Sequence, residues 1–162
     1  MLKFAGIILV SGAVSLMGAN KASAIKENIS ARRELLGLLI HIKRSIEHTS
    51  TPLNIIYGTF ESKALERCGF SELLKSGRTD AFKDALCSSR LVLPEKTAVL
   101  YKEIAENIGR SCFKKKELDV LERYIPQISA VDDELEKEDL SKIKLYRKLG
   151  ILFGILAAVI LI

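Results

Sequence analysis

The stretch FAGIILVSGAVSLMGA, residues 4–19, contains no charged side chain, and neither does LGILFGILAAVILI, residues 149–162, at the other end of the chain. As helices, these stretches would be about 24 Å and about 21 Å long at about 1.5 Å per residue. The hydrocarbon core of a bilayer is about 30 Å thick, and polar residues at a helix end, here Asn20 and Lys21, can reach its surface. The sequence therefore predicts a transmembrane helix at each end, over residues 1–25 and 145–162.

The charged residues are concentrated between these two apolar ends. All 20 acidic residues and 23 of the 25 basic residues lie within residues 26–148 of the 162-residue chain, and only Lys3 and Lys21 lie outside that range. Aromatic residues make up 6% of the chain and Trp is absent, which is a poor composition for a β-sandwich or barrel. This distribution argues against an ordinary soluble domain, a disordered tail protein and a disulfide-stapled toxin.

Residues 26–144 show helical periodicity and no strand pattern. The apolar residues Leu35, Leu39, Ile42 and Ile46 follow each other at steps of four, three and four, which places them on one face of a helix ending near Thr49. Other helices are predicted from the caps that start and stop them. The starts are Thr51-Pro52, Thr79, Leu93-Pro94 and Ser111, and the stops are Gly69 and Gly109. The predicted fold is all-α, a compact cytoplasmic helical bundle flanked by an N-terminal and a C-terminal transmembrane helix.

The basic residues near the apolar ends predict the orientation. Lys21, Lys26, Arg32 and Arg33 follow the first stretch, and Lys142, Lys144, Arg147 and Lys148 precede the second. Basic residues favour the cytoplasmic side of a membrane, so the middle region is expected in the cytoplasm. The alternative is a signal peptide cleaved at Ala22-Ser23-Ala24, which would make the chain a secreted or membrane-anchored extracellular binding module.

Signals for catalysis are weak, and we expect no catalytic residue, no metal site and no cofactor. His41 and His48 are seven residues apart, whereas metal sites on a helix favour spacings of three or four. The cysteines Cys68, Cys87 and Cys112 form no C-x-x-C pair, and no phosphate-binding loop is present. The three lysines at residues 114–116 lack interleaved aromatic residues, so nucleic-acid binding is not expected.

Two features predict contacts with partners. Six acidic residues lie within residues 132–139, interrupted by Leu135 and Lys137, and this block is either a solvated stretch or an electrostatic docking strip. Small residues four apart on each apolar stretch predict close packing of membrane helices, with each other or with a partner. The packing candidates are Ser11, Ser15, Ala19, Gly150, Gly154 and Ala158, and the docking candidates are Thr51, Pro52, Leu53, Asp132, Asp133 and Glu136.

Several local runs carry a resemblance that covers almost the whole chain. They are Arg33-Glu34-Leu35-Leu36, Thr51-Pro52-Leu53, Ile108-Gly109-Arg110-Ser111, and KLYRKLGILFG at residues 144–154. With these runs and this layout, the chain resembles the stage III sporulation protein AB family of endospore-forming bacteria. That family is similar in turn to the cytoplasmic helical domain of type II secretion F proteins.

The resemblance implies a structural role in sporulation and no enzymatic activity. The chain would be an inner-membrane platform of a secretion-like channel complex, in the mother-cell-derived outer forespore membrane, with most of its residues in the cytoplasm. Its implied partners are the membrane, other stage III sporulation channel proteins and a secretion-type cytoplasmic ATPase, the stage III sporulation protein AA. An oligomer is compatible with this role. Because such roles rest on the family, they are expectations to be tested on the site itself.

Overall fold

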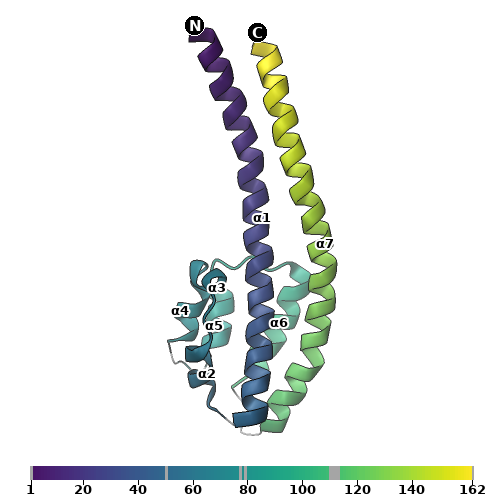
Figure 1. Ribbon diagram of the computed structural model, residues 1–162. Coiled ribbons are helices and arrows are strands. Elements are labelled where there is room, and N and C mark those ends of the chain that lie inside the picture. Colours follow the sequence, from purple (N-terminus) through teal and green to yellow (C-terminus); the bar gives the residue numbers. More distant parts are fainter. Residues whose placement is uncertain (1, 50, 77, 79, 110–113, 162) are drawn as a thin grey trace. The chain divides into compact units, whose positions relative to one another are not determined.

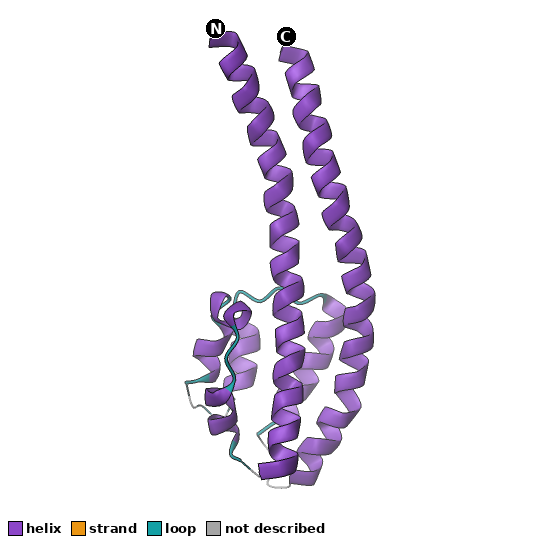
Figure 2. Ribbon diagram, viewed as in Figure 1, coloured by secondary structure: helices purple, strands orange, loops and turns teal. Residues whose placement is uncertain are grey.

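The computed structural model describes residues 2–49, 51–76, 78, 80–109 and 114–161, without the side chains of residues 2–11, 14, 160 and 161. Every regular element in these residues is a helix (Figure 2). This confirms the all-α prediction for the described part of the chain. Two of the predicted caps, Thr79 and Ser111, lie outside the described residues.

The chain divides into two compact units. Unit 1 comprises residues 1–29 and 135–162, and unit 2 comprises residues 30–134. The two longest helices, α1 (Leu2–Thr49) and α7 (Lys114–Leu161), each contribute to both units (Figure 1). The membrane helices predicted from the sequence cover residues 1–25 and 145–162. Unit 1 extends further along both long helices, to residue 29 on α1 and from residue 135 on α7.

Five short helices complete the described part of unit 2. They are α2 (Leu53–Thr59), α3 (Lys63–Arg67), α4 (Phe70–Leu74), α5 (Ala81–Ser88) and α6 (Glu95–Asn107). The pairs in contact are α2 with α4, α3 with α4, α4 with α5, and α5 with α6. Each short helix is therefore held by a neighbour, as helices of this length require tertiary packing to persist.

The region after Thr49 corrects two details of the sequence prediction. Pro52, rather than Thr51, is the residue that caps α2, and its carbonyl accepts the first backbone bonds of the helix, from Ile55 and Ile56. The helix expected to run as far as Gly69 is two helices, because the side chain of Ser62 accepts a bond from the Leu65 amide and starts α3 there. A serine in this position is a strong N-cap, which apolar periodicity alone does not reveal.

Glycines end two elements as predicted. Gly69 has φ 75° between α3 and α4, and Gly109 has φ 78° after α6. This left-handed conformation is costly for residues with a Cβ atom. The Gly109 amide donates to the carboxylate of Glu117, which belongs to the first turn of α7, at 3.0 Å. This bond ties the end of α6 to the first turn of α7.

The core of unit 2 is a single apolar cluster. The predicted face of α1 is fully inside it, since Leu35, Leu39 and Ile42 are 0% exposed and Ile46 is 4% exposed. The cluster also contains Leu121 and Ile128 of α7, Tyr101 and Ile104 of α6, and Phe70 of α4, whose ring contacts that of Phe82 edge to face. Burial of these side chains drives folding because apolar surface leaves water.

Unit 1 is a pair of helical segments from α1 and α7. Among the described side chains of this unit, the buried cluster is small and consists of Ala22, Ile29 and Ile143, with Ile25 packed against it. Among the residues whose side chains are described, no helix combines the length and the apolar character needed to cross a bilayer. The two flanking transmembrane helices expected from the sequence are therefore not confirmed.

Candidate functional site

The two segments of unit 1 meet at a pair of glycines. A Cβ atom placed on Gly150 would lie 3.2 Å from the Cα of Gly18 and 3.2 Å from the carbonyl oxygen of Ser15. The hydroxyl of Ser15 also donates to the carbonyl of Gly150, at 3.3 Å. Glycine lets helix backbones approach this closely, which is how helices associate where burial from water contributes little.

The predicted packing residues have different positions in this pair. Gly154 is buried and Ala158 is half-buried, on the same side of α7 as Gly150. Ser15 is half-buried at the contact, whereas Ala19 is exposed and the contact face of α1 continues through Gly18 and Ala22. The side chain of Ser11 lies outside the described residues. The structure therefore brings Ser15 and Gly150 together and turns Ala19 away.

The opposite side of this helix pair is apolar and open. The last part of α7 exposes six large apolar side chains to between 53% and 64%. They are Ile151, Leu152, Phe153, Ile155, Leu156 and Val159. On α1, Leu16 and Met17 are exposed to 64% and 70%. A contiguous apolar surface of this kind marks an interaction with another protein or with lipid.

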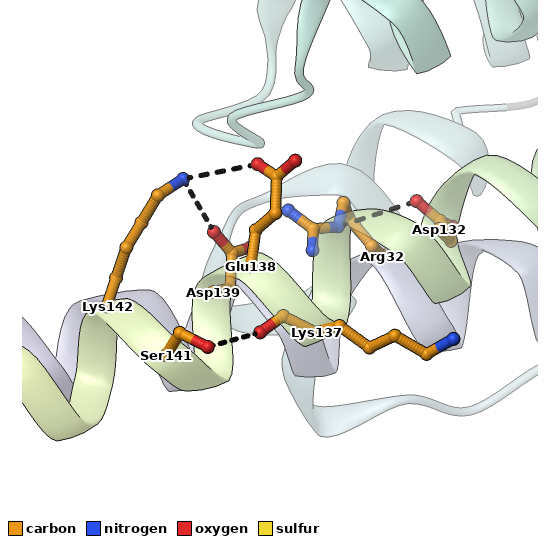
Figure 3. A network of polar contacts seen from close by, with 7 residues as sticks. All are labelled: Arg32, Asp132, Lys137, Glu138, Asp139, Ser141 and Lys142. Carbon is orange, nitrogen blue, oxygen red and sulfur yellow. Dashed lines mark hydrogen bonds and ion pairs between the residues drawn. The ribbon is translucent and has the colours of Figure 1, made fainter.

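Unit 1 also contains charged residues on α7. Lys142 reaches Asp139 at 3.4 Å and Glu138 at 3.9 Å, in the one-turn spacing that allows such pairs (Figure 3). The Ser141 hydroxyl donates to the carbonyl of Lys137 at 3.0 Å, also one turn away. The pair with Glu138 is exposed and contributes little stability, whereas the Asp139 side chain is only 14% exposed, so Lys142 neutralises this part of the acidic block locally.

In unit 2, a buried ion pair joins the two long helices. Nε of Arg32 lies 3.5 Å from a carboxylate oxygen of Asp132, and their side chains are only 5% and 12% exposed (Figure 3). The two residues are one hundred positions apart in sequence. Buried charges persist where they are paired. The pair therefore fixes how α1 and α7 face each other inside unit 2.

Tyr101 of α6 lies in the electrostatic field of this pair. Its side chain is 0% exposed, and within the described residues its hydroxyl has no hydrogen-bond partner. Burial raises the pKa of the Tyr101 phenol far above its ordinary value, the negative charge of Asp132 raises it further, and Arg32 lowers it. The phenol therefore stays neutral in the folded protein at physiological pH.

The predicted docking residues divide between accessible and internal positions. Pro52 is exposed, and Thr51 and Leu53 are half-buried at the start of α2. Asp133 is exposed in unit 2 and Glu136 is half-buried in unit 1. Asp132 instead points inward to Arg32 and is not offered to a partner. The acidic block is therefore not a uniform strip.

The histidines and cysteines show no convergence in the described residues. His41 Nε2 lies 3.3 Å from the Thr59 hydroxyl, and its ring is 5.5 Å from that of Phe60. Cys68 donates its thiol to the Leu65 carbonyl, and Cys87 is exposed. No group of metal-ligating side chains is found among the described residues.

Sequence reasoning missed the Arg32–Asp132 pair, although a signal was available. Arg32 continues the buried face of α1 at steps of three from Ile29 and to Leu35, and Asp132 follows Ile128 at a step of four on α7. A single charge at a core position of each of two helices indicates that the charges pair. Arg32 was instead counted among the basic residues that set the membrane orientation, to which a buried, paired charge contributes little.

The comparisons with known proteins bear on the whole chain. A family model described as Stage III sporulation protein AB matches residues 3–162. No curated protein and no solved structure matches the chain. The matched range includes the glycine contact, the exposed apolar side of α7 and the buried ion pair.

Proposed function

The chain belongs to the stage III sporulation protein AB family, and from that premise we propose that it is a non-enzymatic platform in the membrane of a sporulating cell. Membership implies a role in sporulation. In the proposed role, unit 1 lies in the membrane and contacts other stage III sporulation channel proteins. Unit 2 is in the cytoplasm and docks a secretion-type ATPase, the stage III sporulation protein AA.

The observation that carries the proposal is that unit 1 has small residues at its helix contact and large apolar side chains on its surface. Its two segments meet through Gly18 and Gly150, and the buried cluster formed by its described side chains is small. Its large apolar side chains, such as Leu152 and Val159, are exposed instead. A helix pair in water buries large side chains, whereas a pair in lipid packs small residues together and presents large ones to acyl chains.

The uncharged run of residues 4–19 supports the same placement. Most of its residues belong to the part of α1 whose side chains are not described, so its apolar character is taken from the sequence. Ala22 of the candidate cleavage motif lies within α1 and is 1% exposed, in the buried cluster of unit 1. Signal peptide cleavage, the alternative, would remove the helical segment that packs on α7.

The docking surface for the ATPase would be on unit 2. Exposed Pro52 with half-buried Thr51 and Leu53 forms one candidate, and exposed Asp133 with its neighbour Glu134 forms another. A carboxylate pair at an accessible surface favours a basic partner and speeds association. Asp132 has no part in this surface because it pairs with Arg32.

Protease protection in intact protoplasts tests the placement. Protoplasts expressing the full chain are treated with trypsin, and an antibody against residues 114–122 follows unit 2. Exposed lysines on α6, Lys96 and Lys102, supply cleavage sites once the protease reaches this unit. We expect unit 2 to survive until the membrane is permeabilised, and the chain to stay with membranes after alkaline carbonate washing.

Two other outcomes have distinct meanings. Digestion in intact protoplasts would put unit 2 outside the cell and favour the extracellular binding module. Release of the chain by carbonate would show that unit 1 does not insert, which would overturn the membrane platform. A known cytoplasmic protein serves as the control for protoplast integrity.

A further inference from the structure

Four basic residues lie at one level of the helix pair in unit 1. The two segments run antiparallel, with both chain ends at the same end of this unit (Figure 1). Because Gly18 faces Gly150, residues shortly after Gly18 on α1 are level with residues shortly before Gly150 on α7. We call the four basic residues at this level the basic collar. They are Lys21, Lys144, Arg147 and Lys148.

The basic collar is not neutralised by the protein. Residues 18–24 and 144–150 together contain these four basic residues and no acidic residue. All four side chains are exposed, and none of them forms an ion pair with a described residue. Lys142, which precedes the collar, differs because Asp139 and Glu138 hold it. The collar therefore retains about four positive charges within about one and a half helical turns.

The collar meets the open apolar side of α7 along a single stripe. Lys144, Lys148, Ile151, Ile155 and Val159 follow each other at steps of four, three, four and four, which is one face of a helix. All five are exposed. The stripe changes from cationic to apolar between Lys148 and Ile151, over about 4.5 Å of helix.

An aromatic side chain marks the same transition. Tyr146 is 37% exposed, and Leu145 beside it is 53% exposed. Tyrosine is enriched at membrane surfaces because its ring is apolar and its hydroxyl is polar. The collar thus combines positive charge, an amphipathic ring and an adjoining aliphatic face.

We propose that the basic collar binds the phosphate groups of anionic phospholipids whose acyl chains cover the aliphatic face of α7. This inference rests on the proposed membrane position of unit 1 and adds the lipid class. A phospholipid supplies an anion and hydrocarbon in the same molecule at the separation seen on the stripe. A nucleic acid or an acidic peptide would match the charges and leave Ile151, Ile155 and Val159 uncovered.

Lipid-selective quenching of tryptophan fluorescence tests the proposal. The chain has no Trp, so Tyr146→Trp introduces a single reporter at the collar. The full-length variant is reconstituted into vesicles of phosphatidylcholine and phosphatidylglycerol, with bromine on the acyl chains of one lipid or the other. Each basic residue near an anionic surface strengthens the binding of that surface about fivefold. The relative affinity for the collar, derived from the quenching, should therefore be at least about fivefold higher for phosphatidylglycerol than for phosphatidylcholine.

Matched charge removals separate the collar from general electrostatics. In the reporter background, Lys144→Gln, Arg147→Gln and Lys148→Gln together should abolish the preference. Lys63→Gln, Lys96→Gln and Lys102→Gln together remove three exposed charges from unit 2 and should leave it unchanged. Raising the salt concentration should weaken the preference as phosphate contacts are screened.

The remaining outcomes overturn one proposal or the other. Equal quenching by the two lipids, or a preference that survives the collar substitutions, would refute anionic lipid binding while leaving the membrane placement intact. Absence of quenching by either lipid would show that the reporter is remote from acyl chains. That result would refute the membrane position of unit 1 and, with it, the lipid site.

Discussion

The contact between Gly18 and Gly150 predicts a specific defect from one added methyl group. In Gly18→Ala, the new Cβ atom would lie 2.7 Å from the carbonyl oxygen of Tyr146 and 2.9 Å from the Cα of Gly150. Ordinary carbon contacts are about 3.5–4.0 Å, so the segments must separate by somewhat less than about 1 Å. Both opposing atoms belong to the backbone, so no side-chain rotation relieves the clash.

Three contributions set the change in the free energy of helix pairing, of which two are destabilising and one is stabilising. Overpacking at a close contact costs about 1–3 kcal/mol. Separation also weakens the bond from Ser15 to the Gly150 carbonyl, for which about 0.6 kcal/mol is typical in membrane helices. Replacing glycine by alanine inside a helix stabilises the helix by about 1 kcal/mol, and this offsets part of the two costs. We therefore expect a loss of about 0.6–2.6 kcal/mol, which corresponds to a change of about 3- to 80-fold in the opening equilibrium of the helix pair.

Hydrogen exchange of the full chain in detergent micelles measures the opening equilibrium of this helix pair. Amides in residues 15–29 and 143–156 should exchange about 3- to 80-fold faster in Gly18→Ala, because exchange follows local opening. The core of unit 2 should be unaffected.

Gly12→Ala provides the matched control on the same helix. Its Cβ atom would meet no atom within 4 Å, so this variant should gain helix stability without loss of packing. If Gly18→Ala and Gly12→Ala exchange at the same rate, or if both are slower than the wild type, the two helices do not meet at these glycines and the reasoning fails.

Three further predictions concern unit 2. Asp132→Ala removes the carboxylate that lies 3.5 Å from Nε of buried Arg32 and should lower the free energy of unfolding in urea by up to about 3–5 kcal/mol, whereas Arg32→Met combined with Asp132→Leu should recover most of that loss. Burial raises the pKa of both Tyr57 and Tyr101 above the ordinary value of about 10, so the unfolded chain loses these protons first and the free energy of unfolding falls as pH rises above about 10. Tyr101→Phe should make that alkaline decline shallower by about 1.4 kcal/mol per pH unit, and an unchanged slope would contradict the assignment. Gly69→Ala should destabilise by about 1–2 kcal/mol in thermal unfolding because its φ is 75°, and a neutral effect would show that the turn relaxes.

The helical character of the chain was predictable because its signals are local. The steps of three and four in residues 35–46 select a helix and also identify its buried face, and the structure confirms both. The helix end at Thr49 and the stops at Gly69 and Gly109 also agree with the prediction. The interruption at Ser62 was missed, since capping there competes with an apolar pattern that continues across it.

The candidate sites were predicted less completely. Gly150 was identified from its spacing with Gly154, and it does lie at a close helix contact. On α1 the same reasoning selected Ala19, which is exposed, and passed over Gly18. Neighbouring residues on a helix are about 100° apart, so spacing defines several faces and does not say which one meets the partner helix.

The sequence by itself determined the class of the fold, the apolar ends and the concentration of charge between them. These properties depend on composition and on residues within a few positions of one another. Only the tertiary structure decided that Gly18 opposes Gly150 and that Asp132 turns inward to Arg32. Both contacts join residues more than ninety positions apart, and they depend on the rotation and the register of one long helix against the other, which no local pattern encodes.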